Sequence, residues 1–140
     1  MNNRFSTGTD PVIKDGELIC RRDLLKPSDL AFRFQVRAGD IASFPGMNAD
    51  DEDYLPAFVI QFGDQYYAYL NRCAHVAMEL DWNPGEVFDM QREYIICATH
   101  YAVYQPETGA CLSGPCPKGS KLISLPIQVN EQGIYLQLKV

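Results

Sequence analysis

Two short motifs constrain this chain more than any other feature: Cys73-Ala74-His75 and Cys97-Ala98-Thr99-His100. Each places a thiol and an imidazole within a few residues, so each can grip a metal from a single loop. The chain has only two histidines, and both lie in these motifs, as do two of its five cysteines. A fold that uses both motifs at one metal centre must bring two loops together.

Each motif follows a segment that is predicted to be a strand. Residues 57–62 and 65–70 are two β-prone runs separated by Gly63-Asp64, a pair typical of a tight hairpin turn. The first motif follows the second of these runs directly. Residues 93–96 are a short strand that runs straight into the second motif. Because a rigid sheet can hold two such loops side by side, the chain can form one shared metal centre.

The remaining segments are also typical of β structure. Residues 17–21 and 32–37 are predicted strands, and in the second of them apolar and polar side chains alternate, the period of a half-buried strand. Residues 121–129 and 134–140 are a final predicted pair, and residues 23–30 contain a proline that leaves room for only a short helical turn. With no repeat and no long amphipathic helix, the sequence predicts an all-β fold, a compact sandwich or barrel.

Composition argues against several classes of function. The chain has 140 residues, about one domain, and its net charge of -6 does not suit nucleic-acid binding, which depends on clustered cations. No run approaches the roughly 20 apolar residues that cross a bilayer, and residues 1–8 lack the apolar centre of an export signal. We therefore expect a cytoplasmic protein with no membrane partner. The odd number of cysteines argues against a disulfide framework.

Taken together, in this order and after strands, the Cys-x-His and Cys-x-x-His motifs resemble the cluster-binding loops of Rieske proteins. In that family two cysteines hold one iron of a 2Fe-2S cluster and two histidines hold the other. The resemblance implies that Cys73 and Cys97 bind the buried iron, and that His75 and His100 bind the outer iron.

The resemblance extends past the ligands and implies a fold. It includes turn residues that follow the second motif in many Rieske ferredoxins, namely Pro106-x-Thr108-Gly109, Gly114-Pro115 and Leu125-Pro126. The stretch at Gly114-Pro115 is expected to cover the cluster as a third loop. The implied architecture is a Rieske-like antiparallel β-sandwich. It is one domain over residues 1–140, with a small cluster-binding subdomain formed by two loops at about residues 71–118.

The family pattern also bears on the reduction potential. Rieske proteins of respiratory and photosynthetic complexes join the two loops by a disulfide, whose positions correspond here to Met78 and Thr99. They also use a serine and a tyrosine as hydrogen-bond donors to sulfur; Ala102 replaces the serine, and Tyr104 stands at the tyrosine position. Since fewer donors stabilise less of the charge added on reduction, we expect a potential near the bottom of the approximately -150 to +300 mV Rieske range.

Other interpretations of the four ligand candidates stay open. A zinc ion takes the same ligand types in a tetrahedral site, although the single residue between Cys73 and His75 is awkward for zinc. The four residues could also be ordinary cysteines and histidines. Their joint spacing after two strands favours the iron–sulfur interpretation over both.

Several further residues have open roles. Cys111 and Cys116 could bridge, bind metal or simply pack, and packing is favoured because free cysteine is often buried. Cys20 is expected in a strand core. Glu79 and Asp81 could tune docking or proton uptake, and a solvated loop face is favoured for them. The acidic stretch before residue 54 is expected to be a solvated loop.

These features favour one-electron carriage. The resemblance implies a ferredoxin that accepts an electron from a reductase and passes it to an oxygenase or a similar acceptor. An enzyme acting alone is not expected, because the mononuclear iron of Rieske oxygenases needs further histidines and this chain has none left. Two alternatives stay open: a redox sensor, and a small accessory subunit of a larger oxidoreductase, like the small subunit of some nitrite reductases.

Overall fold

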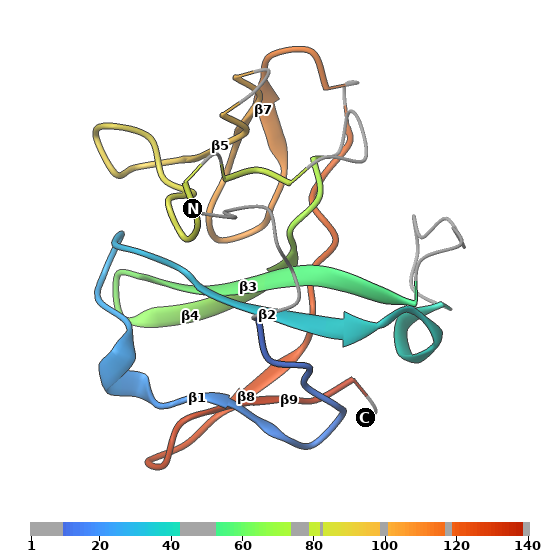
Figure 1. The fold of residues 1–140 in the computed structure, drawn as a ribbon. Coiled ribbons are helices and arrows are strands. Elements are labelled where there is room, and N and C mark those ends of the chain that lie inside the picture. Colours follow the sequence, from blue (N-terminus) through green and yellow to red (C-terminus); the bar gives the residue numbers. More distant parts are fainter. Residues whose placement is uncertain are drawn as a thin grey trace, which may run out of the picture.

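The computed structural model describes residues 10–42, 53–73, 79–81, 83–98, 101–116 and 119–138. Within these ranges the regular elements are short strands and two 3-10 turns, and no α-helix occurs (Figure 1). The all-β class predicted from the sequence is confirmed. The same residues contain no helix with the length and apolar character needed to span a bilayer.

The described strands form three antiparallel sheets of three strands each, ordered β1-β9-β8, β2-β3-β4 and β5-β6-β7. The elements in chain order are β1 (Leu18–Cys20), η1 (Arg22–Leu24), β2 (Phe32–Arg37), η2 (Ala38–Ile41), β3 (Tyr54–Phe62), β4 (Gln65–Leu70), β5 (Ile95–Ile96), β6 (Val103–Tyr104), β7 (Cys111–Ser113), β8 (Ile127–Val129) and β9 (Ile134–Leu136).

The β2-β3-β4 sheet is the middle layer of the molecule, with one of the other sheets on each side (Figure 1). Because successive side chains of a strand point to opposite faces, β3 contributes to two cores. Ala57 and Val59 pack in the core that includes β1 and β9, whereas Phe58 and Ile60 pack in the core that includes β5 and β6. All four side chains are fully buried. The middle sheet is therefore held on both faces and is a rigid base for loops.

The predicted hairpin is confirmed as β3 and β4. Ala57 lies opposite Leu70 and Phe62 opposite Gln65, with Gly63 in the turn. Gly63 has a φ of 61°, a left-handed conformation that glycine adopts without steric cost. The strand β3 begins earlier than predicted, at Tyr54. Most of the acidic stretch before it lies outside the described residues.

The strand β2 forms where predicted, but it is not half-buried. Phe34 and Val36 are fully buried on one face, as expected from the alternating pattern. The polar side chains between them are also buried, with Arg33 only 8% exposed and Gln35 only 7% exposed. The prediction of a solvated polar face was wrong. Arg33 lies opposite Phe58 of β3, so its side chain lies on the face of the second core.

Four other predicted strands are shorter than expected, and the first of them, at residues 17–21, is a strand only at Leu18–Cys20. The segment before the second motif is a strand only at Ile95–Ile96, and the final pair is reduced to β8 and β9. Residues 122–125 lie alongside β4 instead of extending β8. Leu70 N donates to Ile123 O, and Leu125 N donates to Ala68 O. Pro126 has no N–H with which to continue such a ladder.

Candidate metal centre

The first motif begins where β4 leaves the middle sheet. The chain passes through Asn71 and Arg72 to Cys73, which is 2% exposed. The backbone N–H of Asn71 donates to Pro56 O of β3 at 2.8 Å, so the approach to Cys73 is fastened to the sheet. The backbone is therefore held in the sheet as far as Asn71, two residues before Cys73.

The second motif begins where β5 ends. Cys97 is fully buried, its N–H donates to Ala102 O at 2.9 Å, and its carbonyl accepts from Tyr101 N at 2.7 Å. These two bonds close the loop between β5 and β6. Tyr101 has a φ of 61°, uncommon for a residue with a Cβ, and its side chain is 71% exposed. An exposed aromatic side chain therefore follows the second motif directly.

The two cysteines belong to one core. Cys73 and Cys97 lie in a single cluster of buried residues, although they come from loops that follow strands of two different sheets. The same cluster includes Ala102, Tyr104 and Cys116. Two cysteine sulfurs buried in one core could bind a metal that prefers thiolate ligands, such as the iron of an iron–sulfur cluster or zinc.

A hydroxyl group reaches one of these sulfurs. Tyr104 is fully buried in β6, and its hydroxyl lies 3.2 Å from Cys73 Sγ. The tyrosine is thus at the place where the sequence resemblance put a donor to sulfur. The alanine that replaces the expected serine, Ala102, is also fully buried and offers no hydroxyl.

A third loop approaches the second. A Cβ added to Gly114 would lie 2.7 Å from Ala102 Cα and 3.1 Å from Tyr101 O, and Gly114 has a φ of 101°. Only glycine fits this position, because both the close approach and the conformation exclude a side chain. The loop at Gly114-Pro115 therefore packs directly on the loop that carries the second motif, as the predicted cover would.

The third loop is bridged. Cys111, at the start of β7, and Cys116 form a disulfide with a Cα–Cα distance of 6.5 Å. The expectation that they simply pack was wrong, although Cys116 does lie in the core with Cys73. The five-residue separation was compatible with either outcome, and only the fold around Gly114 brings the two sulfurs together. Cys20 lies in the other core, as predicted.

Both histidines of the motifs, His75 and His100, lie outside the described residues, so the full ligand set stays a prediction. Among the described residues there is no group of three or more histidine, cysteine or acidic side chains that could hold a metal. The described part of the predicted ligand set is thus the two cysteines, Cys73 and Cys97, which lie in one core.

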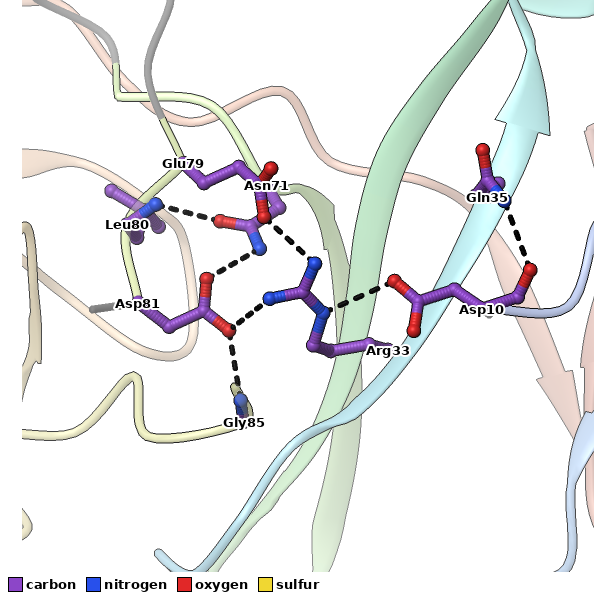
Figure 2. Close-up of polar contacts among 8 residues, drawn as sticks. All are labelled: Asp10, Arg33, Gln35, Asn71, Glu79, Leu80, Asp81 and Gly85. Carbon is purple, nitrogen blue, oxygen red and sulfur yellow. Dashed lines mark hydrogen bonds and ion pairs between the residues drawn. The ribbon is translucent and has the colours of Figure 1, made fainter. Parts of the chain in front are cut away.

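A charged network joins Arg33 to residues on both sides of the first motif in sequence, and sequence reasoning missed it (Figure 2). The Arg33 guanidinium donates to Glu79 Oε1 at 2.8 Å, to Asp81 Oδ2 at 3.0 Å and to Asp10 Oδ2 at 3.1 Å. Asp81 is 1% exposed. The expectation of a solvated face for Glu79 and Asp81 was wrong, because both turn inward to one buried cation.

The network shifts two pKa values. Burial raises the pKa of Glu79; the Arg33 charge opposes this effect, and the charges of Asp81 and Asp10 add to it. Burial works against the charge of Arg33, but the attraction of Asp81, Glu79 and Asp10 exceeds it and raises the pKa of the guanidinium. The arginine stays charged, and Glu79 holds its proton more readily than an ordinary glutamate.

Sequence comparison identifies a family. Residues 35–129 match the Rieske 2Fe-2S domain, a range that covers more than half of the chain and all four predicted ligands. No curated protein sequence matches the chain.

Structure comparison gives matching folds. The ferredoxin of carbazole 1,9a-dioxygenase from Nocardioides aromaticivorans IC177 is 22% identical, with a TM-score of 0.61 over 90% of this chain and 100% of that chain. A chain from the complex of reduced oxygenase and oxidized ferredoxin in carbazole 1,9a-dioxygenase is 22% identical, with a TM-score of 0.58 over 86% and 99%. The quaternary ammonium Rieske monooxygenase CntA is 15% identical, with a TM-score of 0.58 over 90% of this chain and 32% of that chain. At these identities the likeness shows a shared fold.

Proposed function

Because the chain belongs to the Rieske 2Fe-2S domain family, we propose that it carries single electrons on a 2Fe-2S cluster bound by Cys73, His75, Cys97 and His100. One observation supports this most: the cysteines of both motifs are buried in one core although they follow strands of different sheets. The cluster supplies one-electron redox chemistry. The chain binds it, shields it from water and sets its potential.

Each described group near the sulfurs has a part in this proposal. Cys73 and Cys97 would hold one iron as thiolates, and Tyr104 would then donate its hydroxyl hydrogen to Cys73, since a thiolate has no proton to give. The third loop packs at Gly114 on the backbone of Tyr101 and Ala102, and would thereby help to shield the buried Cys97 from water. The donor set of two sulfurs inside and two imidazoles outside is the Rieske pattern.

The partners follow from the chemistry of a carrier. We propose that a reductase supplies the electron and that an oxygenase or a similar protein accepts it, in the cytoplasm. Two of the matching folds come from the ferredoxin of a carbazole dioxygenase and from a complex of an oxygenase with its ferredoxin, which supports this choice. Tyr101, which directly follows the second motif, is 71% exposed, so a large aromatic side chain is available there to contact a docked partner.

Spectroscopy tests the cluster. Reduced, anaerobically purified protein should give the low average g of a Rieske centre in electron paramagnetic resonance, whereas a zinc site gives no signal. Replacing the fourth predicted ligand, in the variant His100→Ser, should abolish or degrade this signal. An unchanged spectrum in that variant would show that the ligand assignment is wrong.

Electron transfer tests the role. With a flavin reductase and a Rieske oxygenase, the protein should support substrate turnover that depends on its concentration, and Tyr101→Ala should weaken that dependence without changing the spectrum. Partner binding that changes with redox state, without onward transfer to any acceptor, would instead indicate a sensor.

A further inference from the structure

Nearly all of the buried polarity in the described part of the chain is gathered in one place. Apart from cysteines and tyrosines, four described residues bury a polar or charged side chain: Arg33, Gln35, Asn71 and Asp81. All four belong to the network drawn in Figure 2. Buried charge is costly unless it is paired and hydrogen-bonded, so a concentration of this kind needs a specific reason.

The guanidinium lies between Asp10, in the N-terminal segment, and the residues that follow the first motif. Its stem stands on β2, and Figure 2 shows Asp10 on one side of it and Glu79 and Asp81 on the other. The two acidic residues are the point where the chain returns from the first motif. The side chain of Arg33 is only 6% exposed, and that of Asp81 is 0% exposed. The return of this loop is thus fastened to the middle sheet by a desolvated ion pair.

Further hydrogen bonds carry the attachment to both motifs. Asn71 Nδ2 donates to Asp81 Oδ1 at 2.8 Å, and Asn71 Oδ1 accepts from Leu80 N at 2.7 Å, which closes the base of the first loop. Leu80 O then accepts from Ala98 N at 2.9 Å, the residue after Cys97. Gly85 N donates to the same Asp81 oxygen that Arg33 holds, at 2.8 Å. The bonded groups therefore form a continuous path from Arg33 to the second motif.

We propose that Arg33 is a positioning residue for the cluster, a proposal that rests on the function proposed above: by holding Glu79 and Asp81, it keeps Leu80 against Ala98 and so fixes the first ligand loop relative to the second. The planar fork of arginine is required, because one group must reach carboxylates on opposite sides at the same time. Lysine keeps the charge but has a single ammonium group, so it cannot make all three contacts.

Five variants distinguish a role of Arg33 in positioning the ligand loop from an effect of its charge alone and from a general loss of folding stability. Arg33→Met removes both charge and fork, Arg33→Lys removes the fork alone, and Asn71→Leu breaks the path beyond the arginine. Asp10→Asn is the matched control, since Asp10 contacts the same guanidinium but lies on the segment away from the ligand loops. Ile134→Ala, in the distant core of β9, is the control for a general loss of stability.

The first readout does not depend on the cluster. Amide hydrogen exchange should become about tenfold faster or more at Leu80 and Ala98 in Arg33→Met, Arg33→Lys and Asn71→Leu, with both controls within about twofold of the unchanged protein. If exchange at these amides stays protected in Arg33→Met and Asn71→Leu, or if Arg33→Lys restores it fully, the positioning role is overturned.

The second readout uses the loaded protein. Iron content per chain should fall and the electron paramagnetic resonance lines should broaden or shift in the three network variants, while Asp10→Asn and Ile134→Ala keep the original line shape. Unchanged lines in the network variants would contradict the proposal. Absence of a Rieske signal in the unmodified protein would refute the proposed function, while the exchange measurement would still decide what Arg33 holds. If Arg33→Met does not fold, Arg33→Lys and Asn71→Leu decide the question.

Discussion

The hydroxyl of Tyr104 lies 3.2 Å from the sulfur of Cys73, and both side chains are buried. A donor in this position stabilises negative charge on a ligand sulfur, and reduction adds negative charge to the centre. The contact also connects the two motifs. Tyr104 lies in β6, the strand that follows the second motif, and Cys73 belongs to the first motif.

Tyr104→Phe should lower the reduction potential. A hydrogen bond of about 0.5–1.5 kcal/mol corresponds to roughly 20–60 mV for a one-electron centre. A redox titration followed by circular dichroism measures this directly. The matched control is Tyr69→Phe, because Tyr69 is also buried but donates to Pro106 O at 2.7 Å and not to a ligand. An equal shift in both variants would show that the tyrosine acts through general destabilisation.

Gly114→Ala should loosen the third loop. The new Cβ would lie 2.7 Å from Ala102 Cα, so the backbone must shift, at a cost of about 1–3 kcal/mol in the free energy of unfolding. Displacing the cover should also speed release of iron to a chelator. Gly119→Ala is the control, since Gly119 has a similar φ of 87° but nothing within 4 Å of the added atom.

Equal iron-release rates in the two glycine variants would mean that the third loop does not shield the site. If Gly114→Ala alone releases iron faster, the contact between the third and second loops is what excludes water. Urea unfolding of both variants separates this effect from the strain that any side chain suffers at a positive φ.

Local signals were enough to predict the hairpin, whereas the pairing of the two sulfurs came from the family resemblance. The turn at Gly63-Asp64 between two β-prone runs specifies its own structure, and β3 and β4 form around it. Such a feature depends on neighbouring residues, so it can be inferred from a single sequence. That Cys73 and Cys97 share one core agrees with the family resemblance, which assigned both to the buried iron; local signals do not give this pairing, because the strands before the two cysteines belong to different sheets.

The charged network could not be inferred in this way. The partners of Arg33 in the ligand loop are 46 and 48 residues away in sequence, and an alternating strand pattern carries no sign that its polar face will be covered. Two acidic residues with one residue between them are typical of a solvated loop. What buries them is the packing of the ligand loop on β2, a tertiary effect that overrides the local pattern.

Loss of the Cys111–Cys116 disulfide should destabilise the protein. Closing so short a loop removes chain entropy worth about 2 kcal/mol from the unfolded state. The double variant Cys111→Ser, Cys116→Ser should show this loss in urea unfolding, and a dithiol reductant should reproduce it in the unmodified protein. The reductant should have no such effect on the double variant. A reductant-induced loss of the same size there would place the sensitivity elsewhere, for example in the cluster itself.

Glu79 should make stability depend on pH. Because its pKa is raised above the ordinary 4.5, the folded protein holds a proton that the unfolded chain releases in the interval between the two values. The contribution of Glu79 to the free energy of unfolding is therefore greatest below pH 4.5 and declines as pH rises through the raised pKa. Each tenfold difference in proton affinity corresponds to ~1.4 kcal/mol.

The measurement is the difference in unfolding free energy between the unmodified protein and Glu79→Gln, from about pH 4 to pH 7. Contributions from the other titrating groups largely cancel in this difference, which should shrink as pH increases. Glu131→Gln, in the exposed turn between β8 and β9, controls for the loss of one surface carboxylate. A difference that grows with pH would mean that attraction to Arg33 outweighs burial, so that the fold favours the charged carboxylate.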